Sequence, residues 1–187
     1  MGITSQEKLL IKIVKILNNL KIKYFITGGF AVSVWGRPRA TFDIDIVVKL
    51  IKPQAIPLTR ALRKISKEGY ADENMIKEAI QHKGEFNFID PNSGLKVDFW
   101  VVEEKISAPP EFENRKLKKI NNQNVYFISP EDLILSKLQW YKQAQSSRHS
   151  EDIQSVLKIS GKKLNMKYLK KWAEKLGLLE IFNELKV

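Results

Sequence analysis

The apolar positions at the start of the chain recur at helical spacing. Between residues 5 and 20 they stand three or four positions apart and so share one helical face. Thr4, followed three residues later by Glu7, forms a capping-box pattern that begins such a helix. The spacing predicts an N-terminal helix from Ser5 to Leu20.

The next part of the chain alternates short β-type runs with helical ones. KYFIT at 23–27 and ATFDIDIVVKL at 40–50 are typical of strands. Between them we expect a brief helix, FAVSVW, that Gly36 ends. A helix from Pro53 to about Ser66 and another across ENMIKEAIQ should follow.

Two hairpins and a helical end complete the pattern. EFNFID and LKVDFWVV flank the turn formers PNSG, which predicts an antiparallel hairpin, and a second hairpin is expected over 116–128 around NNQN. Ser129 can cap a helix that has Pro130 in its first position. Ser150 and Asn165 are expected to begin two further helices, the second ending near Gly177.

This order predicts an α/β (α+β) fold with a mixed central sheet flanked by helices. At 187 residues, 43% of them hydrophobic, the chain has the length of one domain, or of one domain with a helical appendage. We expect an α/β core over residues 1–128 and a basic helical region over residues 129–187.

The amino-acid composition limits the kinds of functional site that the chain can form. The absence of cysteine excludes disulfides, thiolate metal sites and cysteine nucleophiles, and two histidines leave little for a histidine-built site. No apolar run approaches the roughly 20 residues that span a bilayer, so a cytoplasmic protein with no membrane partner is expected. Of the net charge of +11, most lies in residues 115–187, which hold 15 Lys and Arg against 7 Asp and Glu. That surplus favours a polyanionic partner, although heavy lysine use alone would also produce it.

Two aspartates share one face of an otherwise apolar strand. Asp43 and Asp45 stand two positions apart, which separates their side chains by roughly 6.5–7 Å on the same face. Their repulsion costs about 2–3 kcal/mol at an effective dielectric near 20. Divalent cations between the carboxylates would explain why the strand tolerates this cost.

Asp98 is a third candidate acid. It is the lone acid of LKVDFWVV, on the face opposite Leu95, Val97, Phe99 and Val101. If this strand lies beside the first, three carboxylates converge on one sheet face. The alternative, that each aspartate only occupies a solvated face, is the usual explanation of an isolated D-x-D.

Gly28 and Gly29 stand between a strand and a short helix, and thirteen residues separate Gly29 from Asp43. Glycines in that place let backbone N–H groups approach phosphate oxygens at a helix N-terminus. Alone, such a pair is more often a tight turn. Combined with DID and the later VDF, it forms a much more specific pattern.

GG, the thirteen-residue gap, DID and VDF together resemble the signature of the nucleotidyltransferase superfamily with a polymerase-beta-type core. More narrowly, GGFAVSVWGRPRATFDIDIVV is similar to the nucleotidyltransferase-like toxins of the AbiEii type. The resemblance covers roughly residues 24–155. It implies a nucleotidyltransferase fold, an NTP substrate, Mg2+ as two ions, and transfer of a nucleoside monophosphate with loss of pyrophosphate.

The resemblance also implies roles for single residues. Gly28 and Gly29 match the phosphate-binding turn, and Asp43 and Asp45 match the metal-binding pair. Asp98 matches the third acid, a metal ligand and a general base for the acceptor hydroxyl.

Arg39 and Thr41 match the nucleotide-binding residues that precede the acids. An arginine beside Pro38 in a loop is about as often merely solvated.

Lys137 is the expected downstream lysine. It falls inside the apolar stripe of its helix, so it needs an anionic partner: an NTP phosphate, or in the alternative a structural carboxylate. Asp152 matches the downstream acid of the toxins and is expected to bind nucleotide. An i,i+4 pair between Asp152 and Arg148 is its alternative.

The aromatic and histidine residues suggest no separate site. Trp35, Trp100, Trp140 and Trp172 stand beside apolar runs, so core packing is expected. His82 and His149 lack metal-ligand spacing and are expected on the surface.

The sequence therefore predicts a Mg2+-dependent nucleotidyltransferase. Because the C-terminal part is basic, RNA such as tRNA is the expected acceptor, in a toxin-like role that implies a possible cognate antitoxin protein. A small molecule or a protein side chain is the alternative acceptor. A non-catalytic module that binds nucleotide, nucleic acid or protein is the alternative of another class.

Overall fold

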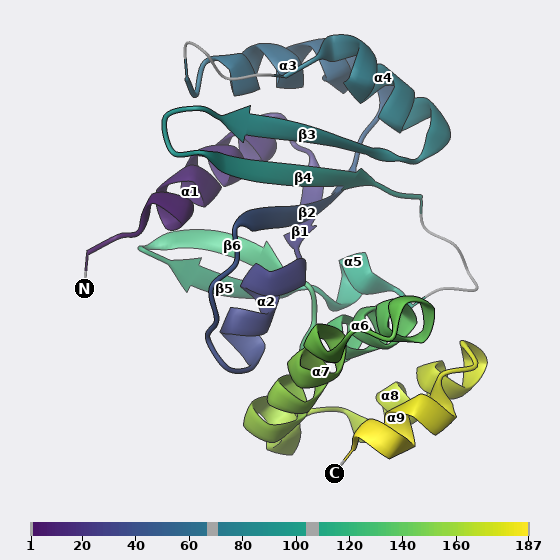
Figure 1. Ribbon diagram of the computed structural model, residues 1–187. Helices are drawn as coiled ribbons and strands as arrows, with labels where there is room; N and C mark the ends of the chain where they lie inside the picture. The colour runs from purple at the N-terminus through teal and green to yellow at the C-terminus, as the bar shows by residue number, and fades with distance from the viewer. Residues whose placement is uncertain (1, 67–70, 104–108, 187) are drawn as a thin grey trace.

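Six strands form one sheet within residues 2–66, 71–103 and 109–186, the part of the chain that the computed structural model describes. Their order across the sheet is β3-β4-β2-β1-β6-β5 (Figure 1). The strands are β1 Lys23–Ile26, β2 Asp43–Lys49, β3 Glu85–Asp90, β4 Leu95–Val101, β5 Lys116–Ile120 and β6 Gln123–Phe127. β2 is parallel to β4 and antiparallel to β1. The mixed sheet and both hairpins that the sequence predicted are confirmed.

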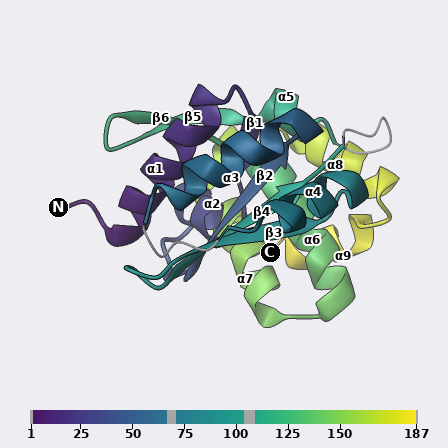
Figure 2. The same cartoon turned by 90° about the horizontal axis from the view of Figure 1, so that it is seen from above.

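Helices cover the sheet and form the C-terminal part. They are α1 Ser5–Asn19, α2 Gly28–Trp35, α3 Ala55–Arg63, α4 Glu73–His82, α5 Glu111–Asn114, α6 Pro130–Ala144, α7 Ser147–Ser160, α8 Met166–Lys175 and α9 Leu179–Leu185. Figure 2 shows α3 and α4 lying across the sheet, and α6 to α9 gather at the opposite end of the molecule (Figure 1). None of the described helices is long and apolar enough to cross a membrane.

The ends of these helices follow local chemistry. Thr4 and Glu7 form the predicted capping box at α1, with the Thr4 hydroxyl accepting from the Glu7 N–H at 3.1 Å. Ser129 caps α6 by accepting from the Asp132 N–H at 3.0 Å, with Pro130 in the first position. α7 begins at Ser147 instead of at the predicted Ser150.

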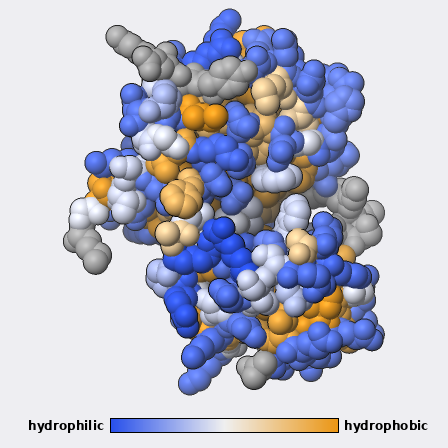
Figure 3. All heavy atoms as spheres, in the orientation of Figure 1, coloured by the Kyte–Doolittle hydropathy of each residue, from blue (hydrophilic) through white to orange (hydrophobic). Residues whose placement is uncertain are grey.

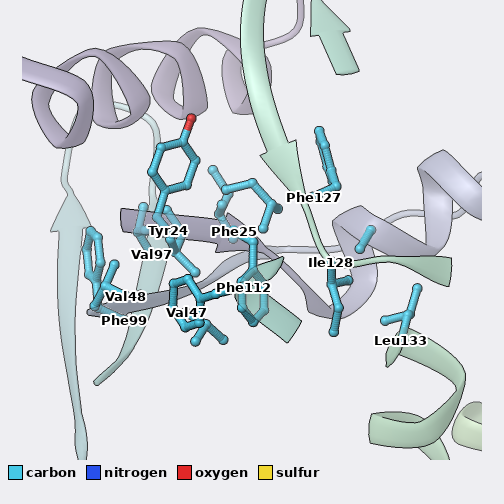
Figure 4. Packing of buried hydrophobic residues seen from close by; sticks show 14 of the residues in the cluster. Tyr24, Phe25, Val47, Val48, Val97, Phe99, Phe112, Phe127, Ile128 and Leu133 are labelled. Carbon is cyan, nitrogen blue, oxygen red and sulfur yellow. The ribbon is translucent and has the colours of Figure 1, made fainter. Parts of the chain in front are cut away.

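The core lies between the sheet and its helices. Phe112 of α5 packs edge-on against Phe25 with ring centroids 4.9 Å apart, and Figure 4 shows it beside Val47 and Ile128. Both phenylalanines are almost fully buried. At about 1.5–3 kcal/mol for each large apolar side chain removed from water, this packing holds the short helix α5 against β1.

One part of the strand prediction is wrong. The sequence placed Phe42 on the buried face with Ile44, Ile46 and Val48, but Phe42 is 81% exposed whereas the other three are fully buried. The reason is pairing: β2 begins only at Asp43, where its ladder with β4 starts. Alternation places a side chain in the core only where neighbouring strands continue the sheet.

Candidate functional site

A cavity of about 550 Å³ is lined by residues from the end of β1, the start of α2, β2, β4, α6 and α7. Such a volume suits a small-molecule site. Its wall includes Gly28, Gly29, Arg39, Thr41, Asp43, Asp45 and Lys137, seven of the residues that the sequence singled out. Figure 3 shows hydrophilic surface gathered over α2 and the loop that follows it, close to this wall.

Both glycines at the start of α2 are required by close contacts. Gly28 has φ +62°, and a Cβ on it would lie 1.8 Å from Oδ2 of Asp45. A Cβ on Gly29 would lie 2.7 Å from Oγ1 of Thr41. The carboxyl group of Asp45 therefore rests directly against the turn at which α2 begins. Thr27, the residue before α2, makes no side-chain capping hydrogen bond, which leaves N–H groups of the turn available to an anion.

The acids of β2 and β4 are neighbours in the sheet. Asp45 lies directly opposite Asp98 in the register, and Asp43 lies opposite Lys96. Asp98 forms an ion pair with Lys96, with Nζ of Lys96 2.9 Å from Oδ2 of Asp98, and Asp98 is not among the residues that line the cavity. The sheet thus brings Asp98 beside Asp45, yet Asp43 and Asp45 alone of the three face the cavity.

Burial, and then the charge of Asp98, raises the pKa of Asp45, whereas Lys137 partly offsets this. In the described parts of the chain no three His, Cys, Asp or Glu side chains are placed to hold one metal ion. The two cavity acids still supply the carboxylate oxygens that Mg2+ prefers, and an added cation would relieve the charge on Asp45. This pair of donors fits a hard divalent cation.

Lys137 and Arg39 meet at one buried carboxylate, Asp152. Nζ of Lys137 lies 2.9 Å from Oδ2 of Asp152, and Nε of Arg39 donates to Oδ1 at 2.8 Å. Burial alone would raise the pKa of Asp152, but the hydrogen bond from Arg39 and the charge of Lys137 outweigh it and hold the pKa below its usual value. The i,i+4 alternative with Arg148 is therefore wrong, and Arg39 is not merely solvated. For Lys137 the alternative holds, since its partner in the structure is a carboxylate of the protein.

Asp152 lies outside the cavity lining, whereas the sequence predicted that it binds nucleotide. Its carboxylate faces two cations and is 3% exposed, and it is not among the residues lining the cavity, whereas Lys137 and Arg39 are. Within this cluster one negative charge faces two positive ones, so one positive charge stays uncompensated there. An anion in the cavity would be attracted to Lys137 and Arg39, and Asp152 would hold both in place.

Among the four tryptophans expected in the core, Trp140 contradicts the prediction, whereas Trp35 and Trp100 are partly buried and pack against the core. Trp140 of α6 is 48% exposed, and its ring lies edge-on to Trp100 and nearly parallel to His149. Trp172 is buried as predicted. His149 is half-buried instead of on the surface, and its burial and the charge of Lys137 lower its pKa. The available sequence signal was the position of Trp140, three residues after Lys137 and so on the same helical face.

Glu111 is a cavity residue that the sequence did not indicate. It lies in α5, a four-residue helix with no periodic pattern to reveal it. Burial, with a smaller contribution from Asp132, raises its pKa to about 7. Among the described residues none donates a hydrogen bond to its carboxyl group.

Comparisons with known proteins bear on the family and the fold of the chain. A family model described as "Nucleotidyltransferase of unknown function (DUF6036)" matches residues 7–187. A comparison with curated proteins gives no match.

Solved structures share the fold. The antibiotic-resistance factor ANT(2'')-Ia is 16% identical, with 96% of this chain and 97% of that chain covered at a TM-score of 0.63. The lincosamide antibiotic adenylyltransferase LnuA, solved with lincomycin, is 16% identical over 85% of this chain and 99% of that chain, with a TM-score of 0.55. An antigenic nucleotidyltransferase-like protein from Paracoccidioides brasiliensis is 23% identical over 85% and 78%, with a TM-score of 0.54. At these identities the likeness shows the nucleotidyltransferase fold, and the narrower resemblance to AbiEii-type toxins stays a prediction.

Proposed function

Since this chain belongs to the family of nucleotidyltransferases of unknown function whose model spans residues 7–187, we propose that it transfers a nucleoside monophosphate from an NTP to an acceptor hydroxyl. The oxygen of the acceptor attacks the α-phosphorus, the bond to the bridging oxygen breaks, and pyrophosphate leaves. The acceptor loses its proton to a base. Catalysis of this kind consists mainly of positioning and charge neutralisation.

One observation carries the proposal. The carboxyl group of Asp45 lies against Gly28, so closely that any other residue there would clash with it. A carboxylate that can hold a cation is thereby set beside backbone N–H groups that can hold a phosphate, and both face one cavity with Lys137. An aspartate that was only solvated would not require this close contact with Gly28.

Each residue then has a role. Asp43 and Asp45 would hold Mg2+, which supplies charge neutralisation on the triphosphate when bound. Gly28 and Gly29 would offer N–H groups to phosphate oxygens, with Thr41 beside Gly29 shaping the turn. Lys137 and Arg39 would bind phosphate oxygens as cations. The role of Asp98 as general base stays a prediction, since its carboxylate is paired with Lys96.

RNA is the acceptor that we propose. The surplus of positive charge in residues 115–187 supports it, because phosphate contacts supply most sequence-independent affinity for nucleic acid. The toxin-like role and an antitoxin partner belong to the same proposal. A small organic acceptor is the second candidate, supported by the apolar part of the cavity wall around Phe25, Val47 and Ile128. Two proteins that share the fold were solved with antibiotics, LnuA with lincomycin and ANT(2'')-Ia with adenylyl-2''-tobramycin, so lincomycin and tobramycin serve as probes of this candidate.

The test is a labelling reaction. The purified protein is incubated with each α-32P-labelled NTP, MgCl2 and total RNA, and RNA and protein are resolved on one gel; parallel reactions contain lincomycin or tobramycin and are resolved by thin-layer chromatography. We expect label on RNA that disappears with Asp45→Asn and persists with Glu85→Gln. Glu85 is a matched control because it is an exposed strand acid outside the cavity.

The outcomes separate the candidates. Label on lincomycin, tobramycin or protein would replace RNA as the acceptor while keeping the reaction. Equal labelling by wild type and Asp45→Asn would refute the assigned site. If no acceptor is labelled and calorimetry detects no Mg2+-dependent NTP binding, the proposed function is wrong.

A further inference from the structure

Trp140 is a large aromatic residue exposed at the wall of the cavity. Its ring centroid lies 6.5 Å from that of Trp100 at 64°, and 6.5 Å from that of His149 at 24°. These three residues come from β4, α6 and α7, and all three line the cavity. Two neighbouring rings thus limit the rotation of the indole while 48% of the residue stays exposed. A side chain that served only core packing would be buried.

We propose that the exposed part of the Trp140 indole stacks on the nucleobase of the bound NTP, with Trp100 and His149 holding the indole in place. This inference rests on the proposed function. It adds a binding site for the base to the site that the acids, the glycine turn and Lys137 form for the triphosphate.

The spacing along α6 suits a nucleotide. Trp140 follows Lys137 by three positions, which is about 4.5 Å along the helix axis on the same face. One helix face therefore offers a cation to the phosphates and an aromatic ring just beyond it. In a nucleotide the ribose separates the base from the α-phosphate, so a ligand whose phosphates contact Lys137 can place its base at Trp140.

The residues next to Trp140 on the cavity wall suit a nucleobase better than a second phosphate group. His149 has a lowered pKa, so its imidazole is neutral near pH 7 and stacks on Trp140 as an uncharged ring. Indole and imidazole surfaces accept any base, because every base has a π-face. The site is thus expected to bind all four NTPs, with differences set by stacking strength.

The experiment compares ligands with and without a base. Isothermal titration calorimetry with MgCl2 measures binding of each NTP and of inorganic tripolyphosphate to wild type, Trp140→Ala and Trp140→Phe. Trp140→Ala should weaken NTP binding by about 5- to 150-fold and leave tripolyphosphate binding unchanged. Trp140→Phe, which keeps a ring, should retain most of the NTP affinity. Ile159→Ala is the control, since it removes an exposed apolar side chain that does not line the cavity.

Two results would overturn the inference while leaving the proposed function intact. In the first, wild type binds NTP no more tightly than tripolyphosphate; in the second, Trp140→Ala weakens both ligands equally. If wild type binds neither ligand in the presence of Mg2+, the inference and the proposed function are both wrong.

Discussion

Replacing Glu111 with glutamine is expected to stabilise the protein above neutral pH and to leave its stability nearly unchanged at pH 4.5. Burial raises the pKa of Glu111 from 4.5 to about 7 in the folded protein. Between these pH values the folded state keeps a proton that the unfolded state has released. The free energy of unfolding that this group contributes therefore falls as pH rises from 4.5 and is fully lost above 7.

The magnitude follows from the shift. At 1.36 kcal/mol for each pKa unit, ionising Glu111 in the folded state costs up to about 3 kcal/mol. Glutamine has nearly the shape of the protonated acid and cannot ionise, so the variant avoids this cost. For a chain of this length, about 3 kcal/mol corresponds to a rise in Tm of roughly 6–12 °C at pH 8.

The assay is thermal unfolding of both proteins at intervals between pH 4.5 and pH 8. Only the difference between variant and wild type is used, because all other titrating groups then cancel. Glu113→Gln is the matched control, because it changes an exposed acid in the same short helix, and the result for Glu111→Gln is compared with it. A Tm difference for Glu111→Gln that stays constant across this range would refute the reasoning.

Two further substitutions test the geometry of the cavity. Gly28→Ala should lower the free energy of unfolding, measured with urea, by at least about 1–2 kcal/mol because of its left-handed backbone, and by more because of the clash with the neighbouring carboxylate. Gly94 has a similar φ but open space around it, so Gly94→Ala should show the backbone cost alone. A similar loss in both variants would mean that the clash is relieved at little cost. Asp152→Asn should destabilise the protein by about 3 kcal/mol, because it leaves two cations without their buried carboxylate, and should weaken NTP binding in calorimetry. Glu151→Gln, an exposed neighbour, should change neither quantity.

The fold was largely predictable because its signals are local. Helix starts at Thr4 and Ser129 depend on side chains that reach only three residues along the chain. The hairpin around PNSG depends on turn chemistry between two apolar runs. The prediction of a buried Phe42 was wrong because burial also requires a paired neighbour, which alternation along one strand cannot reveal.

Some residues of the candidate site were also predictable from local sequence, and others were not. Asp43 and Asp45 were recognisable because two acids on one face of an apolar strand carry an electrostatic cost that asks for an explanation. Glu111 and His149 were missed because nothing near them in the sequence is unusual. They belong to the cavity only because α5 and α7 pack against it.

What the sequence determined by itself was therefore the chemistry of short stretches: the glycine turn, the pair of strand acids, the lysine in an apolar helix stripe, and the order of helices and strands. Tertiary structure alone decided which groups meet. It placed Asp152 between Arg39 and Lys137, 113 and 15 residues away. It also left Trp140 exposed on the cavity wall instead of in the core. The physical reason is range: helix caps, turns and alternation act over a few residues, whereas desolvation and ion pairing depend on distances in space that only the packed chain sets.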